Sequence, residues 1–154
     1  MKQVPTTDSG AVMSYEIIEH TADIGLRIRA KDLNRLFKDA AEGFFDLVTD
    51  LEAVKKSGPF SLHEIEMNLQ EENVEELFMR WLQELLFIFS TRKSILLEYN
   101  FVSLTPMLLR LKAKAIRFDP KKHVSRHEIK AVTFHQFRVT HDASGWLAEV
   151  IFDI

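Results

Sequence analysis

The 154-residue sequence contains no cysteine. This absence excludes a disulfide framework, a thiolate zinc site and a cysteine nucleophile. Long hydrophobic stretches are also missing, because the longest purely apolar run in the strongest helix candidate covers only residues 85–89. A membrane-spanning helix needs about 20 such residues. The polar first 12 residues do not resemble a signal peptide. We therefore expect a soluble, cytoplasmic protein with no membrane partner.

Motifs of familiar enzymes are absent as well. We find no Gly-rich phosphate loop, no nucleophile elbow and no pair of histidines at helical spacing with a glutamate between them. His123 and His127 are four residues apart, but they fall in a charged stretch that we expect to be a loop, so they are a weak metal pair. The sequence alone therefore indicates no familiar enzyme.

The net charge of −3 conceals an asymmetry along the chain. Residues 105–141 hold nine Lys and Arg against only Asp119 and Glu128, a local charge of +7, and the rest of the chain carries −10. A basic segment on an acidic body suits contact with an anionic surface such as nucleic acid. The alternative is two solvated faces of opposite sign.

Apolar spacing predicts an α+β fold, with a mainly antiparallel sheet of about seven strands, two main helices and a C-terminal β-hairpin. Asp32 and Asn73 are suited to cap helices that run to about residues 48 and 90. The strands are expected near residues 15–19, 24–30, 64–69, 95–104, 107–118, 129–140 and 146–154. Residues 13–154 would form one domain. Residues 1–12 would be an extension, either flexible or not native to the protein.

Two acidic positions are candidates for a metal site. Asp23 closes the tetrapeptide His-Thr-Ala-Asp at a junction between two expected strands, and Asp153 precedes Ile154 at the end of the last strand. Carboxylate oxygens of this kind suit Ca²⁺, Mg²⁺ or Mn²⁺ better than Zn²⁺. The structural alternative is a local turn at Asp23 and an exposed Asp153 with no shared site.

The segment Ile129-Lys130-Ala131-Val132-Thr133-Phe134-His135 places a lysine among hydrophobic neighbours. Strand alternation puts Lys130 on the same face as Val132 and Phe134. The ammonium can extend to solvent, or it can reach the two carboxylates, since the hairpin brings its strand beside the last one. His135, on the other face, is either an edge histidine or a member of the site.

These segments together resemble a known family. The stretch Tyr15-Glu16-Ile17-Ile18-Glu19-His20-Thr21-Ala22-Asp23-Ile24-Gly25 is similar to the opening of archease, and the segment of residues 129–135 and the terminal Asp153-Ile154 are similar to its closing parts. The similarity spans residues 15–154. Position 134 is Phe where many archeases carry Tyr, which puts any hydrogen-bonding role of that position in doubt.

The resemblance implies an accessory protein and not an enzyme. Archeases activate the RtcB-type RNA ligase of tRNA splicing by promoting its guanylylation and multiple turnover. Carried over, Asp23, Asp153 and Ile154 would bind a divalent metal, calcium first, with magnesium or manganese as alternatives. Lys130 would be functionally required, and His20 and His135 would support the site. The ligase would be the main partner, with tRNA or a tRNA-modifying enzyme as further partners.

Two other functions remain open at this point. The basic segment 105–141 could make the protein an RNA-binding or chaperone module of tRNA processing, with a steep salt dependence of binding. No aromatic residues alternate with basic ones there as they do on stacking platforms. A metal-dependent hydrolase built on Asp23, Asp153 and His135 is the third reading.

Overall fold

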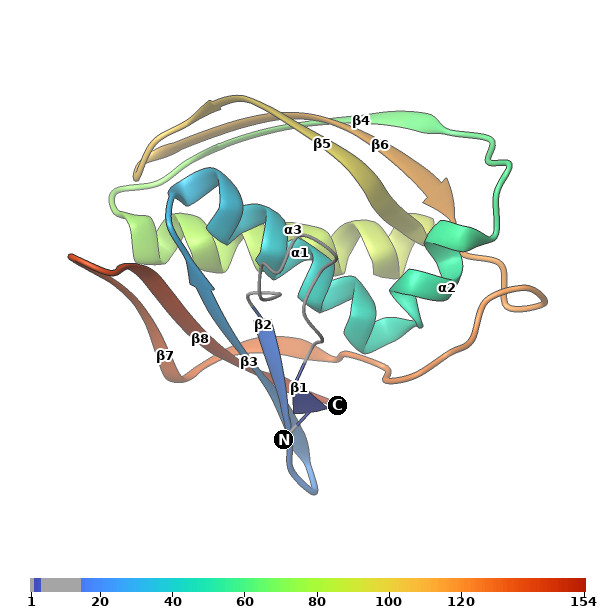
Figure 1. Ribbon diagram of the computed structural model, residues 1–154, viewed down its shortest axis with the longest axis horizontal. Helices are drawn as coiled ribbons and strands as arrows, with labels where there is room; N and C mark the ends of the chain where they lie inside the picture. The colour runs from blue at the N-terminus through green and yellow to red at the C-terminus, as the bar shows by residue number, and fades with distance from the viewer. Residues whose placement is uncertain (1, 4–14) are drawn as a thin grey trace.

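The computed structural model describes residues 2–3 and 15–154 (Figure 1). Its elements in chain order are β1 (Lys2–Gln3), β2 (Tyr15–Glu19), β3 (Asp23–Ala30), α1 (Leu33–Val48), α2 (Leu51–Lys56), β4 (His63–Gln70), α3 (Val74–Arg92), β5 (Ser94–Leu104), β6 (Leu108–Arg117), β7 (Ala131–Asp142) and β8 (Gly145–Asp153). Of the expected N-terminal extension, residues 1 and 4–12 lie outside the described residues. Lys2 and Gln3 pair antiparallel with β2.

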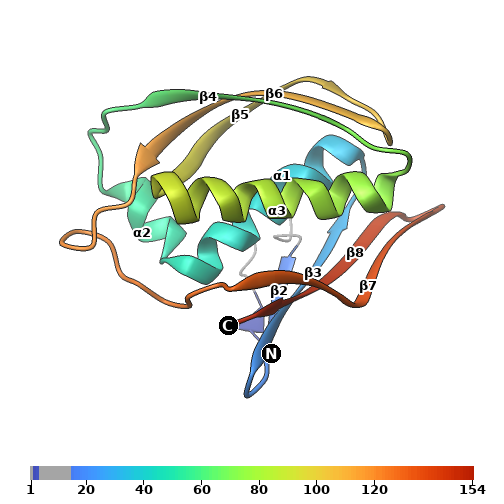
Figure 2. The same cartoon turned by 180° about the vertical axis from the view of Figure 1, so that it is seen from behind.

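The strands form two antiparallel sheets, one of five strands in the order β1-β2-β3-β8-β7 and one of three in the order β4-β6-β5. Figures 1 and 2 show the helices in a layer between these sheets. The predicted α+β class, the seven longer strands and the hairpin of β7 and β8 are confirmed. Where we expected one sheet, the strands divide into two, because each covers one side of the helical layer.

Local sequence signals explain where the two long helices begin. The side chain of Asp32 accepts a hydrogen bond from the backbone N–H of Arg35 at 2.8 Å, and that of Asn73 accepts one from Glu76 at 2.9 Å. These N-caps satisfy backbone donors that the first turn leaves without partners. Both helix starts predicted from the sequence are confirmed.

Large aromatic side chains fill the core between the layers. Phe37 of α1 contacts Phe78 and Trp81 of α3, with ring centroids 5.3 and 6.2 Å apart. The indole N–H of Trp81 donates to the carbonyl oxygen of Phe37 at 2.9 Å, so burying this ring leaves no polar group unsatisfied. Phe44 packs 5.9 Å from Phe152 of β8. The C-terminal strand is therefore anchored on the helices almost to its last residue.

β7 departs from the regular strand that alternation predicts. Its pairing with β8 shifts register between Thr133 and Arg138, and Gln136 adopts a left-handed backbone with a φ of 53°. Phe134 is consequently 68% exposed, whereas Phe137 packs 6.2 Å from the ring of Phe78. A β-bulge of this kind redirects side chains, which is why simple alternation failed here.

No helix in the described part of the chain is both long and apolar enough to cross a membrane.

Candidate functional site

Asp23 and Asp153 meet at one end of the five-stranded sheet. Asp23 opens β3, Asp153 closes β8, and the strand register places them directly opposite each other. Side chains of such cross-strand neighbours lie on one face with Cβ atoms about 4.5–5.5 Å apart. Asp153 also lies opposite Ala131 of β7, so β8 brings three distant segments together. The sequence left open whether the two acidic residues share a site or lie apart. The structure places them next to each other.

One oxygen of Asp23 is in an unusual state. Its Oδ1 is buried and has no hydrogen-bond partner among the described residues. The backbone around it is satisfied, because the carbonyl oxygen of Asp23 accepts the N–H of His20 at 3.1 Å and closes the β2–β3 turn. A buried carboxylate oxygen without a donor costs free energy unless a cation or donor reaches it. The side chain therefore fits the requirements of a metal ligand.

The other ligands available near Asp23 are few. No group of three His, Asp or Glu side chains in the described residues is placed to hold a metal ion. Two carboxylates, from Asp23 and the exposed Asp153, are present, and further oxygens would have to come from the main chain or end of Ile154. An all-oxygen set of this kind suits Ca²⁺ and Mg²⁺.

Lys130 does not reach the carboxylates. Its backbone N–H donates to the carbonyl oxygen of Asp153 at 2.8 Å, which holds the start of β7 against the end of β8. Its exposed side chain makes no ion pair within 4.0 Å to any acid of the described residues. Alternation explains this, because Lys130 shares a face with Val132, whereas Asp153 shares one with Ala131. The ammonium is available to a partner.

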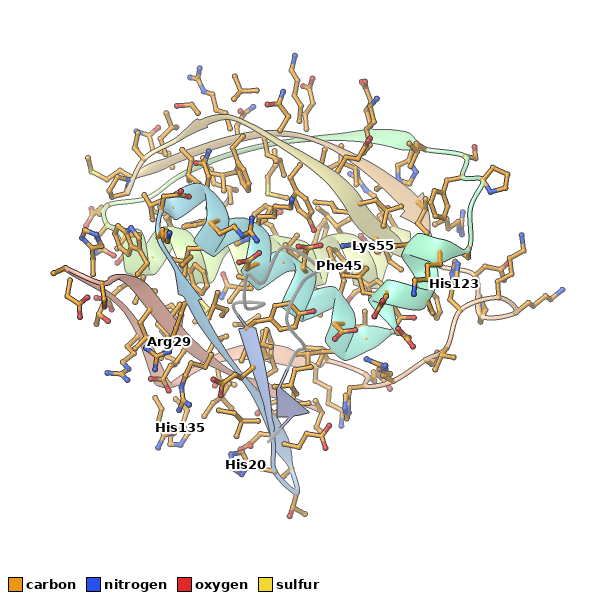
Figure 3. All side chains as sticks on the ribbon, viewed as in Figure 1. His20, Arg29, Phe45, Lys55, His123 and His135 are labelled. Carbon is orange, nitrogen blue, oxygen red and sulfur yellow. The ribbon has the colours of Figure 1, made fainter. Side chains whose placement is uncertain are left out.

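The two predicted histidines are both exposed (Figure 3). His20 lies in the β2–β3 turn. His135 lies in the bulge of β7, where its backbone N–H donates to Thr133 Oγ1 at 3.3 Å. No hydrogen bond of either imidazole to Asp23 or Asp153 occurs within residues 15–154. The structure thus places His20 in the turn before Asp23 and His135 within β7, and joins neither to the carboxylates.

Part of the positive charge of the basic segment 105–141 is compensated by acidic residues that lie close to it in the structure. The register of the three-stranded sheet places Lys114 of β6 between Glu64 of β4 and Glu98 of β5, and Lys112 beside Glu66. Opposite charges on neighbouring strands stabilise each other. This part of the segment therefore presents mixed charge, which is neither a basic face nor the two solvated faces of opposite sign that the alternative expected.

Other cations of the same stretch pair with acids elsewhere. Arg126 contacts Asp46 at 3.0 Å and Asp50 at 3.5 Å, and Arg138 pairs with Glu149. The weak histidine pair also has separate roles: His123 accepts the N–H of Asp119, and His127 lies 3.9 Å from Glu19. The contacts of Arg126 and His127 link distant parts of the chain and could not be found from linear spacing, whereas that of His123 is local.

A row of four alternating charges crosses the outer face of the five-stranded sheet, and sequence reasoning missed it. Arg27 lies 3.6 Å from Glu16 and 3.4 Å from Glu149, which also binds Arg138. Burial raises the pKa of Glu149, but the hydrogen bonds and charges of Arg138 and Arg27 outweigh it and lower the pKa overall. The period-two placement of Arg27 was the available signal, but only the register reveals its partners.

Comparison with known proteins now bears on the whole chain. Residues 15–154 match the model of the archease protein family (MTH1598/TM1083). The chain belongs to the archease family. The archease of Sulfurisphaera tokodaii is 30% identical over 145 residues, which cover 93% of this chain and all of that protein. The archease of Methanopyrus kandleri is 32% identical over 145 residues, 92% of this chain and all of that one.

Solved structures agree with the archease fold. Protein 1598 of Methanobacterium thermoautotrophicum, solved in solution, superposes with a TM-score of 0.68 and 27% identity, covering 93% of this chain and all of that one. The Thermotoga maritima archease, described as a possible chaperone, has a TM-score of 0.62 and 21% identity over 89% of this chain and 94% of that one. The second match shows the fold alone.

Proposed function

We propose that this archease is an accessory protein that activates an RtcB-type RNA ligase in tRNA splicing and RNA repair. It would promote guanylylation of the ligase and its multiple turnover, and would not be an enzyme by itself. Membership of the archease family supports an accessory role. The observation that carries the proposal is the pairing of Asp23 with Asp153, together with a buried Asp23 oxygen that has no hydrogen-bond partner among the described residues.

Asp23, Asp153 and Ile154 would hold a divalent cation, with calcium as the first choice and magnesium or manganese as alternatives. Ile154 would contribute a main-chain or terminal oxygen. When bound, the cation supplies positive charge that can neutralise phosphate oxygens. The strands hold the two carboxylates at one end of the sheet, where they can enter the nucleotide site of a partner without a change of backbone.

Lys130 would supply the second positive charge toward the phosphates of the ligase-bound nucleotide or RNA. Its side chain is exposed and makes no ion pair within residues 15–154, so no internal partner has to be displaced. A lysine ammonium at a developing phosphate charge stabilises it electrostatically. His20 and His135, which are both exposed, would line the same contact surface.

The test combines the full chain with a cognate RtcB-type ligase, GTP and the divalent cation. We expect Asp23→Asn and Asp153→Asn, which keep side-chain size, to lower the rate of ligase guanylylation and the number of turnovers to near the level without archease. Glu72→Gln, which removes an exposed carboxylate before α3, is the matched control and should activate like the wild type. Full activation by both Asn variants would refute the proposal.

A further inference from the structure

A second candidate site lies far from the two aspartates. A pocket of about 400 Å³ is lined by side chains from residues 57–61, which follow α2, and from residues 116–123, which begin with the last two residues of β6. Figure 3 shows His123 of this pocket and His20 of the β2–β3 turn at separate ends of the molecule. The pocket is of the size that small-molecule sites occupy in proteins. It plays no part in the ligase mechanism proposed above.

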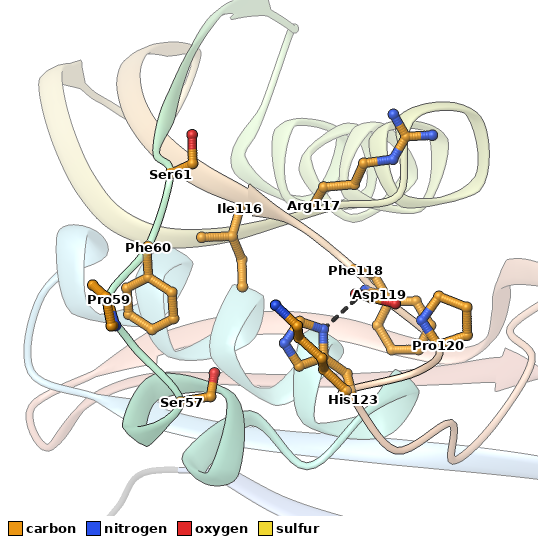
Figure 4. Close-up of a pocket in the computed structure, with 11 residues that line it drawn as sticks. Ser57, Pro59, Phe60, Ser61, Ile116, Arg117, Phe118, Asp119, Pro120 and His123 are labelled. Carbon is orange, nitrogen blue, oxygen red and sulfur yellow. Dashed lines mark hydrogen bonds between the residues drawn. The ribbon is translucent and has the colours of Figure 1, made fainter.

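The pocket is lined by aromatic and apolar side chains together with polar and charged ones. Phe60 and His123 lie on opposite sides of it, with Ile116 between them and Ser57 at the rim (Figure 4). The ring of Phe118 supports His123 at a centroid distance of 5.6 Å. Two rings facing a shared space with an apolar floor can accept a flat heterocycle between them.

The orientation of His123 is fixed by the backbone. Its Nδ1 accepts the N–H of Asp119 at 2.9 Å, so the neutral ring carries its proton on Nε2. The carboxylate of Asp119 in turn accepts the N–H of Lys121 at 2.9 Å, and its carbonyl oxygen accepts the N–H of Lys122. The loop that carries the ring is therefore held by its own hydrogen bonds, and Nε2–H remains a donor.

The cations around the pocket are unpaired. Arg117 and Lys122 line it and Lys121 adjoins it, and none of the three forms an ion pair within 4.0 Å in the described part of the chain. Asp119 is the single acid among the lining residues. Lys112 and Lys114 of β6 likewise form no ion pair within 4.0 Å among the described residues, but the strand register places a glutamate beside each of them. At the pocket, three cations face a single acid.

We propose that this pocket binds a nucleotide. The base lies between the rings of Phe60 and His123, and the phosphate contacts the ammonium of Lys122. Bases present flat π faces that stack on aromatic and histidine rings, and a phosphate forms strong charge-assisted hydrogen bonds with a lysine ammonium. A free nucleotide and a nucleotide within an RNA strand share this chemistry, and the two sources are separated by the probes below.

The binding test follows amide NMR shifts of the ¹⁵N-labelled full chain during titration. The probes are AMP, adenosine, phenyl phosphate and a five-residue oligoadenylate RNA. We expect saturable shifts confined to residues 57–61 and 116–123, with AMP binding at least fivefold more tightly than adenosine or phenyl phosphate. Tighter binding of AMP than of the RNA identifies a free nucleotide as the source, and the reverse order identifies an RNA strand.

Two substitutions test the assigned contacts. Lys122→Gln should weaken AMP binding at least fivefold, and Phe60→Leu should weaken both AMP and adenosine. Lys112→Gln removes the same charge from β6 and should bind AMP like the wild type. Equal binding by the Lys122 and Lys112 variants would overturn the proposal. Shifts spread over other surfaces, or phenyl phosphate binding as tightly as AMP, would overturn it as well.

Discussion

Asp23 and Asp153 lie directly opposite each other on neighbouring strands, although they come from opposite ends of the domain. No local signal at either residue requires this contact. The neighbouring residues Ile24 and Phe152, which are paired on the other face of the sheet, are buried in the core. Two adjacent carboxylates repel each other unless a cation or a proton intervenes. The arrangement therefore leads to predictions about both metal binding and stability.

The first prediction concerns calcium and the melting temperature of the isolated protein. Calcium at a hundredfold excess over its Kd should raise the melting temperature by several degrees, because binding to the native state alone adds about 2.7 kcal/mol. Asp23→Asn should abolish this increase, and its metal-free form should melt no lower than the wild type, because a repulsive contact is gone. Glu72→Gln should keep the increase. An unaltered calcium response in Asp23→Asn and Asp153→Asn would exclude them as ligands.

The second prediction separates Lys130 from the metal ligands. Lys130→Gln should lower ligase activation about tenfold, an effect of about 1.4 kcal/mol, while leaving the calcium-induced rise in melting temperature intact. Lys130→Arg, which keeps the charge, should recover most of the activation. The readouts are the guanylylation rate and a thermal melt of the same samples. Loss of the calcium response in Lys130→Gln would contradict a role toward the partner's phosphates.

The third prediction concerns Arg27, which lies between Glu16 and Glu149. Arg27→Gln should lower the free energy of unfolding by about 1–2 kcal/mol, because it leaves two partly buried carboxylates without their shared cation. Urea denaturation at low and high salt measures the loss. Arg29→Gln, on the same face of the same strand but exposed, is the control and should cost less than about 0.5 kcal/mol. Equal losses in both variants would show that the ion pairs do not stabilise the sheet.

The fourth prediction is a pH dependence that arises from Asp39. Burial raises the pKa of this carboxyl from 3.8 to about 6, against the opposing charge of Arg35 and with a contribution from Glu42. Because the folded protein binds this proton more tightly than the unfolded chain, Asp39 lowers stability progressively as pH rises from about 4 to 6.

Replacement of Asp39 by Asn should remove that dependence. The gain in unfolding free energy over the wild type should be about 2 kcal/mol larger at pH 7 than at pH 4, as expected for a shift of about two pKa units. Urea denaturation of both proteins across this pH range measures it. Glu72→Gln should show no such pH-dependent difference. If the difference in unfolding free energy between Asp39→Asn and the wild type did not change with pH, the pKa of this carboxyl would not be raised by folding.

The helices and most strand positions could be predicted because their signals are local. Asp32 and Asn73 cap the first turn of the helix that follows them, whatever the rest of the chain does. The hairpin of β7 and β8 likewise follows from a short turn between two strand patterns. The bulge in β7 could not be predicted, because it depends on Phe137 reaching Phe78 on a helix distant in sequence.

The linear sequence determined the α+β class, the helix starts, the residue types of the candidate metal site and the resemblance to archease. Tertiary structure alone decided which charges face each other: Asp23 opposite Asp153, Lys114 between two glutamates, and Arg117 and Lys122 beside a pocket with no ion pair to any other described residue. The physical reason is that helix caps and hydrophobic periodicity depend only on residues close together in the sequence. Strand register, which sets electrostatic neighbours, results from packing the whole core.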